Sequence, residues 1–357
     1  MKIKIILLGL LLLVSAGAFA DSWKTALQLH NRLTGVPPSK DVLRKMSLLI
    51  ESNQVELAAH EAMENKYFYN IVLKNWAKPW TNEDQNNRVD FNDYVATIIG
   101  LIRDDVPFSR VLHGDILYTV GVGDIAAYSP DSNDHYKEAE ENHIDLKENL
   151  AVATQSELNG ISDTAGVITS RASGEAFFSD GTNRAMTRYT FMNFLCKDFE
   201  DLHDVNIPDF RVRKDIDRKP GNDSRTFKNK CVGCHAGQDA LGGAFSYFDF
   251  VDGAVTHTPG VVVEKINRNN LFSQGFFTTN DSWLNLWATG QNASLGWKGV
   301  QQGSGAKSLG NMLSQSKAFS RCMVQKSYKL VGLNDAKSVL SETEIDQYAS
   351  MFETTMG

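Results

Sequence analysis

The segment Lys230-Cys231-Val-Gly-Cys234-His235 constrains this chain more than any other part of its sequence. Two cysteines three positions apart lie on one side of a helical turn, where each thiol can form a thioether with a vinyl group of haem. The histidine that follows directly is then placed to bind the haem iron as its proximal ligand. Only one such motif occurs in the 357 residues. The motif therefore predicts one covalent haem c, held by Cys231 and Cys234, with His235 on the iron.

Two other chemistries use a C-x-x-C pair. A redox-active cysteine pair is expected in a thioredoxin-like βαβ context, which this segment lacks. A zinc site needs further cysteine or histidine ligands at close spacing, and His257 is the only histidine after the motif. The haem interpretation is therefore favoured over both.

Residues 1–20 have the layout of a secretory signal sequence. Lys2 and Lys4 form a positive start, an apolar run extends from Ile5 to Val14, and small residues precede Asp21. The apolar run is shorter than a membrane-spanning helix needs, although an uncleaved anchor is the alternative. We expect cleavage near Ala20, a periplasmic or extracellular location, and no membrane span in the mature chain.

Charge and composition narrow the class of protein further. Lys and Arg number 36 against 43 Asp and Glu, which gives a net charge of -7, and no basic stripe interrupts this balance. Nucleic-acid binders normally show a basic excess, so that class is excluded. A hydrophobic content of 42% supplies ample material for a folded core.

Hydrophobic periodicity predicts a mainly α fold with short β elements. Apolar faces of helical period occupy residues 22–77, interrupted at Pro37-Pro38, and Ser39 is expected to cap the helix that follows. Further helices are expected over residues 91–102, 175–202 and 308–352.

A change in composition predicts where the chain divides. The polar segment 129–148 is expected to be a solvated helix or linker, so residues 21–150 should form a helical N-terminal domain and residues 151–357 a cytochrome c-like haem-binding domain. In the latter, a hairpin is expected around Pro259-Gly260, between residues 245–248 and 261–263.

The sixth iron ligand and the two remaining cysteines are separate questions. Met312 lies in a glycine-rich segment that could approach a haem closely, so it is the predicted sixth ligand. Met323, His257 and a five-coordinate iron are the alternatives. Cys196 and Cys322 form either one disulfide or two separate buried thiols. An oxidising compartment favours the disulfide, whereas free cysteine also packs well in a core.

Several short segments resemble those of the planctomycete-type cytochrome c proteins, a group assembled from domains of unknown function. The similarity covers most of the mature chain. The segments that carry it are Arg32-Leu-Thr-Gly-Val-Pro-Pro38, Asn92-Asp-Tyr94, Asp105-Val-Pro-Phe108, Gly166-Val-Ile-Thr-Ser170, Arg184, Phe194-Leu-Cys196, Cys231 to Gly242, Phe248-Asp249, and Ser316 to Tyr328.

The resemblance implies a secreted haem protein, and it favours a Cys196–Cys322 bridge because the matching family segments also carry cysteine. Three residues depart from the family pattern: Gln238 replaces a methionine, Ala240 a proline and Ala185 a glycine. If the family uses that methionine near the iron, this chain does not.

Three functions fit these features. Electron transfer through one haem c, with a redox partner protein, is the leading interpretation because no catalytic constellation is recognisable. A haem-dependent oxidoreductase, peroxidase-like with an open distal site lined by His257 or Arg225, is the second. A partner-docking module that carries a redox haem is the third. The sequence favours an electron-transfer protein over a stand-alone enzyme.

Overall fold

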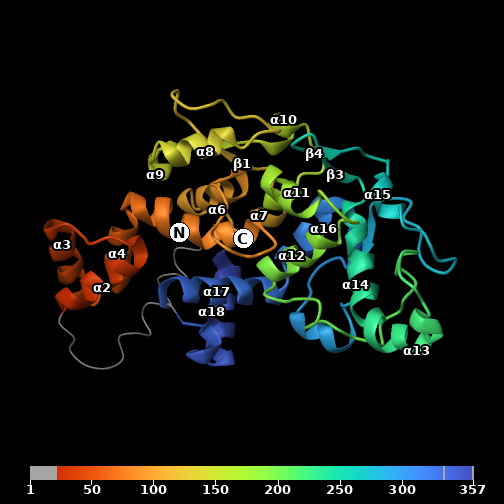
Figure 1. The fold of residues 1–357 in the computed structure, drawn as a ribbon. Coiled ribbons are helices and arrows are strands. Elements are labelled where there is room, and N and C mark those ends of the chain that lie inside the picture. The colour runs from red at the N-terminus through yellow and green to blue at the C-terminus, as the bar shows by residue number, and fades with distance from the viewer. Residues whose placement is uncertain (1–21, 333, 356–357) are drawn as a thin grey trace.

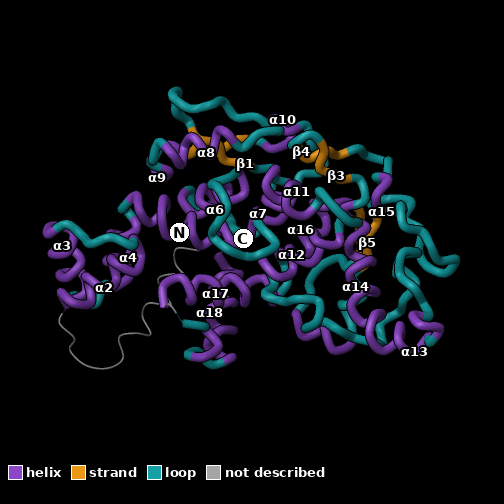
Figure 2. Tube along the Cα trace, viewed as in Figure 1, coloured by secondary structure: helices purple, strands orange, loops and turns teal. Residues whose placement is uncertain are grey.

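The computed structural model describes residues 22–332 and 334–355, and this part of the chain is mainly helical. Its strands form three separate two-stranded antiparallel sheets (Figures 1 and 2). The predicted mainly α fold with short β elements is therefore confirmed. The molecule is elongated, with α2, α3 and α4 at one end and α13 at the other (Figure 1). The predicted signal sequence, residues 1–20, lies outside the described residues.

The N-terminal elements form a helical lobe. They are α2 (Ser22–Thr34), α3 (Lys40–Glu51), α4 (Val55–Met63), the π-helical turn η2 (Phe68–Leu73), α5 (Lys74–Ala77) and the 3-10 turn η3 (Lys78–Thr81). Apolar side chains at helical spacing, such as Leu29, Leu33 and Met46, are buried between the first three helices. Ser39 accepts a hydrogen bond from the backbone N–H of Val42, which confirms the predicted cap.

The middle of the chain is built around one buried helix. Its elements are α6 (Asp93–Arg103), α7 (Arg110–His113), β1 (Leu117–Val120), α8 (Asp134–Glu141), α9 (Leu146–Asn149), β2 (Leu150–Ala153), α10 (Gln155–Asn159), η4 (Gly166–Thr169), α11 (Arg171–Phe177) and α12 (Arg184–Phe194). Helix α6 occupies the predicted range, and it is buried from Asp93 to Ile102 because neighbours cover it all round.

The predicted domain boundary at residue 150 falls at the start of a strand. Leu117 pairs with Ala153 and Val120 with Leu150, so β1 and β2 form one sheet across this position. Helix α7 also packs against α16 (Gly305–Ser314). The two predicted domains therefore share a sheet and core packing, and their division near residue 150 stays a prediction.

The second half begins with long connections and contains the C-x-x-C-H segment. Its elements are η5 (Pro220–Asn222), α13 (Ser224–Thr226), η6 (Phe227–Cys231), α14 (Val232–Gly242), η7 (Gly243–Phe245), β3 (Phe248–Val251), β4 (Ala254–His257), α15 (Glu264–Asn267), β5 (Ser282–Leu284), η8 (Gly290–Leu295), β6 (Gln302–Ser304), α16, α17 (Lys317–Gly332), η9 (Ala336–Ser338) and α18 (Glu342–Thr355).

The predicted hairpin around Pro259-Gly260 is wrong. The strands are β3 and β4, with Phe248 opposite His257 and Val251 opposite Ala254, so the two-residue turn is Asp252-Gly253. Both turn residues have positive φ, 51° and 87°. An Asp-Gly pair adopts this geometry readily and matches the twist of the strands, whereas Pro259-Gly260 only follows β4.

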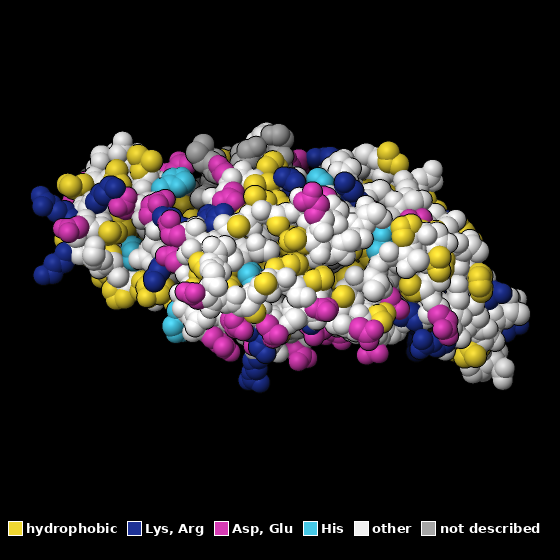
Figure 3. Space-filling view, turned by 90° about the horizontal axis from the view of Figure 1, so that it is seen from above, with side chains coloured by type: hydrophobic (Ala, Val, Ile, Leu, Met, Phe, Trp, Pro, Cys, Tyr) yellow, Lys and Arg dark blue, Asp and Glu magenta, His cyan; other side chains and the backbone are white. Residues whose placement is uncertain are grey.

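The surface carries mixed charge. In the view of Figure 3, acidic, basic and hydrophobic side chains are interspersed, and acidic side chains gather along one long edge. Within the described residues, no helix combines the length and the apolar character that a bilayer crossing requires.

Candidate haem-attachment site

The C-x-x-C-H segment lies where a π-helical turn passes into an α-helix. Cys231 ends η6, and Cys234 and His235 lie in the first turn of α14. Both thiols are free and partly exposed. Burial, and then the nearby carboxylates Glu200 and Asp198, raise the pKa of Cys234. The two thiols are thus available on one helical turn, as thioether formation requires.

Glycines on the opposite face of α14 allow close packing. A Cβ at Gly233 would lie 2.6 Å from the imidazole of His203, and a Cβ at Gly237 would lie 2.2 Å from the indole of Trp287. Neither position accepts a larger side chain without a shift of these rings. The buried glycine face therefore fixes α14 and leaves the cysteines and His235 on the more exposed side.

His235 lies next to a buried carboxylate one turn along the helix. Its side chain is 27% exposed, and its Nδ1 lies 3.9 Å from Oδ1 of Asp239, which has no exposed side-chain surface. This distance is too long for a hydrogen bond, and among the described residues the buried Nδ1 has no other partner. The orphaned nitrogen faces a group that orients such rings in metal sites.

Asp239 is held as a carboxylate by its surroundings. Burial opposes its ionisation, but Arg184 donates to it from Nε at 2.6 Å and Nη2 at 2.9 Å, and the backbone N–H of Arg213 donates at 3.0 Å. Arg184 therefore keeps the pKa of Asp239 well below its usual range. Arg184 also pairs with Asp215 at 2.5 Å, so one guanidinium joins two carboxylates.

Two further arginines near α14 have buried guanidinium N–H groups that, among the described residues, donate no hydrogen bond. Among the described residues, Nε and Nη2 of Arg213 and Nη1 of Arg218 are buried without a hydrogen-bond partner. The guanidinium of Arg218 lies over the ring of Phe227 in η6, 4.5 Å from its centre. Such donors suit anionic groups, and haem carries two propionates. Free thiols, an imidazole with an orphaned Nδ1 and unused guanidinium N–H groups together fit a covalent haem.

The predicted sixth ligand, Met312, lies in α16. Its side chain is 3% exposed, and its Sδ accepts a hydrogen bond from Nδ2 of Asn285 at 3.8 Å. The nearby glycine has a packing role, since a Cβ at Gly310 would lie 1.7 Å from the carbonyl oxygen of Leu112 in α7. The glycine-rich sequence therefore brings α16 against α7, and Met312 as an iron ligand stays a prediction.

The alternative ligands have other contacts. Met323 is fully buried in α17. His257 stacks on Phe248 with ring centres 4.4 Å apart, and its Nδ1 lies 3.2 Å from Oγ of Ser162. Arg225, the alternative distal group, is exposed and pairs with Asp223 at 2.7 Å.

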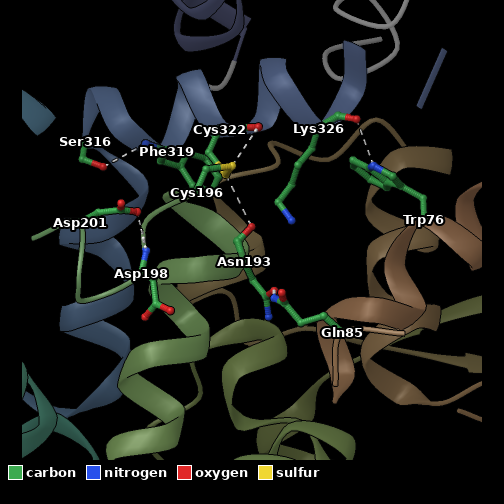
Figure 4. Close-up of a disulfide and its surroundings, with 10 residues drawn as sticks. All are labelled: Trp76, Gln85, Asn193, Cys196, Asp198, Asp201, Ser316, Phe319, Cys322 and Lys326. Carbon is green, nitrogen blue, oxygen red and sulfur yellow. Dashed lines mark hydrogen bonds between the residues drawn. A yellow bond between two sulfur atoms is a disulfide. The ribbon is translucent and has the colours of Figure 1, made fainter. Parts of the chain in front are cut away.

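The predicted disulfide between Cys196 and Cys322 is confirmed (Figure 4). The two Cα atoms are 5.2 Å apart, within the usual range for a bridge. The single helix predicted over residues 175–202 is wrong, because α11 ends at Phe177 and α12 spans only Arg184–Phe194. Cys196 follows α12 with a φ of 52°, and the chain turns there toward α17.

Sequence reasoning missed how Asp239 and Arg184 are used. Both belong to the segments that carry the family resemblance, and the i, i+4 spacing of His235 and Asp239 is a signal that places them on one helix face. No motif or spacing in the sequence indicated that Asp215 pairs with Arg184. No group of three or more His, Cys, Asp or Glu that could hold a metal ion occurs in the described part of the chain.

No known family model, no curated protein and no solved structure matches this chain.

Proposed function

We propose that this protein is an exported monohaem c-type cytochrome of the planctomycete type, which transfers electrons through one haem c attached to Cys231 and Cys234. The observation that carries the proposal is the arrangement on α14. Two free thiols and a partly exposed imidazole share one turn, and the Nδ1 of that imidazole faces the buried Asp239. Ligating histidines usually donate this second N–H to a carboxylate or carbonyl.

Each residue has a defined task in this proposal. His235 binds the iron through Nε2, Asp239 orients the imidazole, and Arg184 keeps Asp239 ionised and in place. Arg213 and Arg218 offer buried N–H groups to the propionates. When bound, haem c supplies a one-electron couple whose potential depends on these contacts and on burial. Met312 is the proposed sixth ligand.

The disulfide supports export. Bridges such as Cys196–Cys322 persist in oxidising compartments and are rare in the cytosol, which agrees with a secretory signal in residues 1–20. A covalent cofactor suits the same location because a dissociated haem would be lost from it.

The side chains near the motif favour an acidic redox partner protein. Lys219, Lys228 and Lys230 are exposed within a dozen or so positions of Cys231, in a chain whose net charge is -7. Asp217 and Asp223 lie in the same stretch, so these lysines offer individual contacts to an acidic partner surface rather than a uniformly basic face.

Intact-mass spectrometry tests the attachment. The protein is produced with a haem c maturation system, and the mature chain should carry the mass of one haem. The variant Cys231→Ser/Cys234→Ser should carry none, whereas the matched variant Cys196→Ser/Cys322→Ser should keep it. A mature wild-type chain without added haem, or haem that acid acetone extracts, would refute the proposal.

Carbon monoxide and cyanide binding separates carrier from enzyme. A closed coordination shell should bind either ligand slowly or not at all, as electron transfer requires. Rapid binding to the ferrous or ferric protein would instead identify an open distal site and overturn the carrier assignment.

A further inference from the structure

A pocket of about 860 Å³ lies between three segments that are far apart in the sequence. One wall comes from η2, α5 and the chain through Gln85, a second from the end of α12 through Asp198, and a third from α17 with the following turn. This volume is in the range that accommodates a small organic molecule. The C-x-x-C-H segment does not line it.

Lys326 lines this pocket. Its side chain extends away from α17 (Figure 4). Its Nζ lies 4.2 Å from the centre of the Trp80 ring, within cation–π distance. Within the described residues, no carboxylate forms an ion pair with it. Part of the side chain stays accessible from the pocket, yet burial, with added repulsion from Lys329, lowers the pKa of Lys326 to about 7.

The rest of the pocket also carries positive charge. The other cations that line it are Arg32, Lys197, Lys329 and Lys337. The only carboxylates among the described lining residues are Asp198 and Asp335. Asp198 accepts two hydrogen bonds from Arg188, at 2.5 and 2.7 Å, and Asp335 accepts from the backbone N–H of Lys337 at 2.8 Å. Both carboxylates are thus already engaged, and the lining has an excess of cations in an acidic chain.

Two tryptophan rings line the pocket next to α17. Trp76 and Trp80 are in edge-to-face contact with ring centres 4.6 Å apart. The indole N–H of Trp76 donates to the carbonyl oxygen of Lys326 at 3.2 Å, which fixes the ring beside α17 (Figure 4). Trp80 is buried behind Trp76 and Lys326, so the partly exposed indole of Trp76 is the surface that favours a planar, conjugated ligand.

We propose that this pocket binds a small aromatic carboxylate, with the Lys326 ammonium as counter-ion of the carboxylate and the partly exposed indole of Trp76 against the ring. An unpaired cation in a confined site gains from an anion that enters it, because that anion supplies the missing counter-charge. Lysine binds such an anion as a compact point charge. The pocket needs no haem, so this inference is independent of the proposed electron-transfer function.

Binding of the anion favours the charged form of Lys326. Ligand binding should therefore take up a fraction of a proton near neutral pH, and affinity should fall as pH rises above 7 because fewer molecules carry the ammonium. Other charged residues also line the pocket: Arg32, Lys197, Lys329, Lys337, Asp198 and Asp335. A variant at Lys326 is therefore needed to measure how much of the pH dependence comes from Lys326 alone.

Isothermal titration calorimetry with 2-naphthoate tests the proposal on the mature protein. Neutral 2-naphthamide is the matched ligand, Lys326→Met the test variant, and Lys307→Met, an exposed lysine on α16 outside the pocket, the control variant. We expect naphthamide and Lys326→Met each to weaken binding by about tenfold or more, and Lys307→Met to leave it unchanged. Titration in buffers of different ionisation enthalpy should show proton uptake that Lys326→Met abolishes.

Several results would overturn the proposal. These are no binding of 2-naphthoate at millimolar concentration, equal binding of the amide, or full affinity in Lys326→Met. Tighter binding of 2-naphthyl phosphate than of 2-naphthoate would reassign the site to phosphate esters. If Lys326→Met does not fold, the pH dependence of wild-type affinity and the amide comparison still decide, because neither requires a variant.

Discussion

Cys196 and Cys322 are bonded to each other across 126 residues, and the C-x-x-C-H segment lies inside the loop that they close. The bridge joins the chain just after α12 to the middle of α17 (Figure 4). Cys196 also lines the pocket that contains Lys326. One covalent bond therefore restrains both the chain that contains the C-x-x-C-H segment and the wall of a separate cavity.

Removal of this disulfide should lower stability strongly. Closing a loop of this length restricts the unfolded chain, so Cys196→Ser/Cys322→Ser should lower the free energy of unfolding by about 3–5 kcal/mol. Urea unfolding of the apoprotein measures the loss, and a reducing agent should produce a similar loss in the wild type. Cys231→Ser/Cys234→Ser is the control, since neither thiol is bonded there. A loss under 1 kcal/mol would show that the bridge contributes little.

The contact between α16 and α7 should depend on Gly310. An added Cβ would overlap the carbonyl oxygen of Leu112, so the helices must separate. Gly310→Ala should cost about 2 kcal/mol of unfolding free energy, although alanine alone favours helix by up to about 1 kcal/mol. Gly123→Ala is the control, because nothing lies within 4 Å of its added Cβ. Equal stabilities of the two variants would contradict this packing role.

The sequence predicted those elements that depend on residues only a few positions apart. The cap at Ser39 and the buried helix over residues 93–103 follow from side chains a few positions apart. The sequence prediction places the hairpin turn at Pro259-Gly260, whereas the turn is Asp252-Gly253, which has positive φ at both positions. Turn chemistry of this kind is a stronger signal than the presence of proline and glycine alone.

Contacts between residues far apart in the sequence could not be predicted in the same way. Trp76 and Lys326 are 250 positions apart, and nothing in either neighbourhood predicts that an indole N–H reaches that carbonyl oxygen. The pairing of Cys196 with Cys322 could be predicted because only two cysteines were left once the motif was assigned. The role of Asp215 could not, because it depends on where Arg184 and Asp239 meet in space.

Glu140 should make stability depend on pH. It receives hydrogen bonds from Lys74 at 2.7 Å, Lys78 at 2.8 Å and the backbone N–H of Phe91 at 2.7 Å. Partial burial opposes its ionisation, but the two lysines outweigh this and lower its pKa from 4.5 to about 2. Because the folded pKa is the lower one, the stabilisation is present above pH 4.5 and is lost as pH falls toward 2.

Urea unfolding of Glu140→Gln at several pH values checks this. At pH 7 the variant should be less stable by about 1–2 kcal/mol, a figure reduced for partial exposure, and the difference should shrink between pH 4.5 and pH 2. The exposed neighbour Glu141→Gln should change stability by less than about 0.5 kcal/mol. A difference independent of pH would mean that the lost contacts are not ionic.

Asp239 should set both the stability of α14 and the potential of the haem that we propose there. Its carboxylate is buried against Arg184 and faces Nδ1 of His235 at 3.9 Å. Asp239→Asn leaves Arg184 with Asp215 alone, which should cost about 3 kcal/mol of unfolding free energy. Loss of a negative charge beside the proximal ligand also disfavours the more positive ferric state, so the reduction potential should rise.

Asp215→Asn is the matched control, because it removes the other partner of Arg184 while Asp239 still faces the imidazole. Redox titration of both variants should give a clearly larger rise for Asp239→Asn; equal shifts would show that Asp239 acts only as a distant charge.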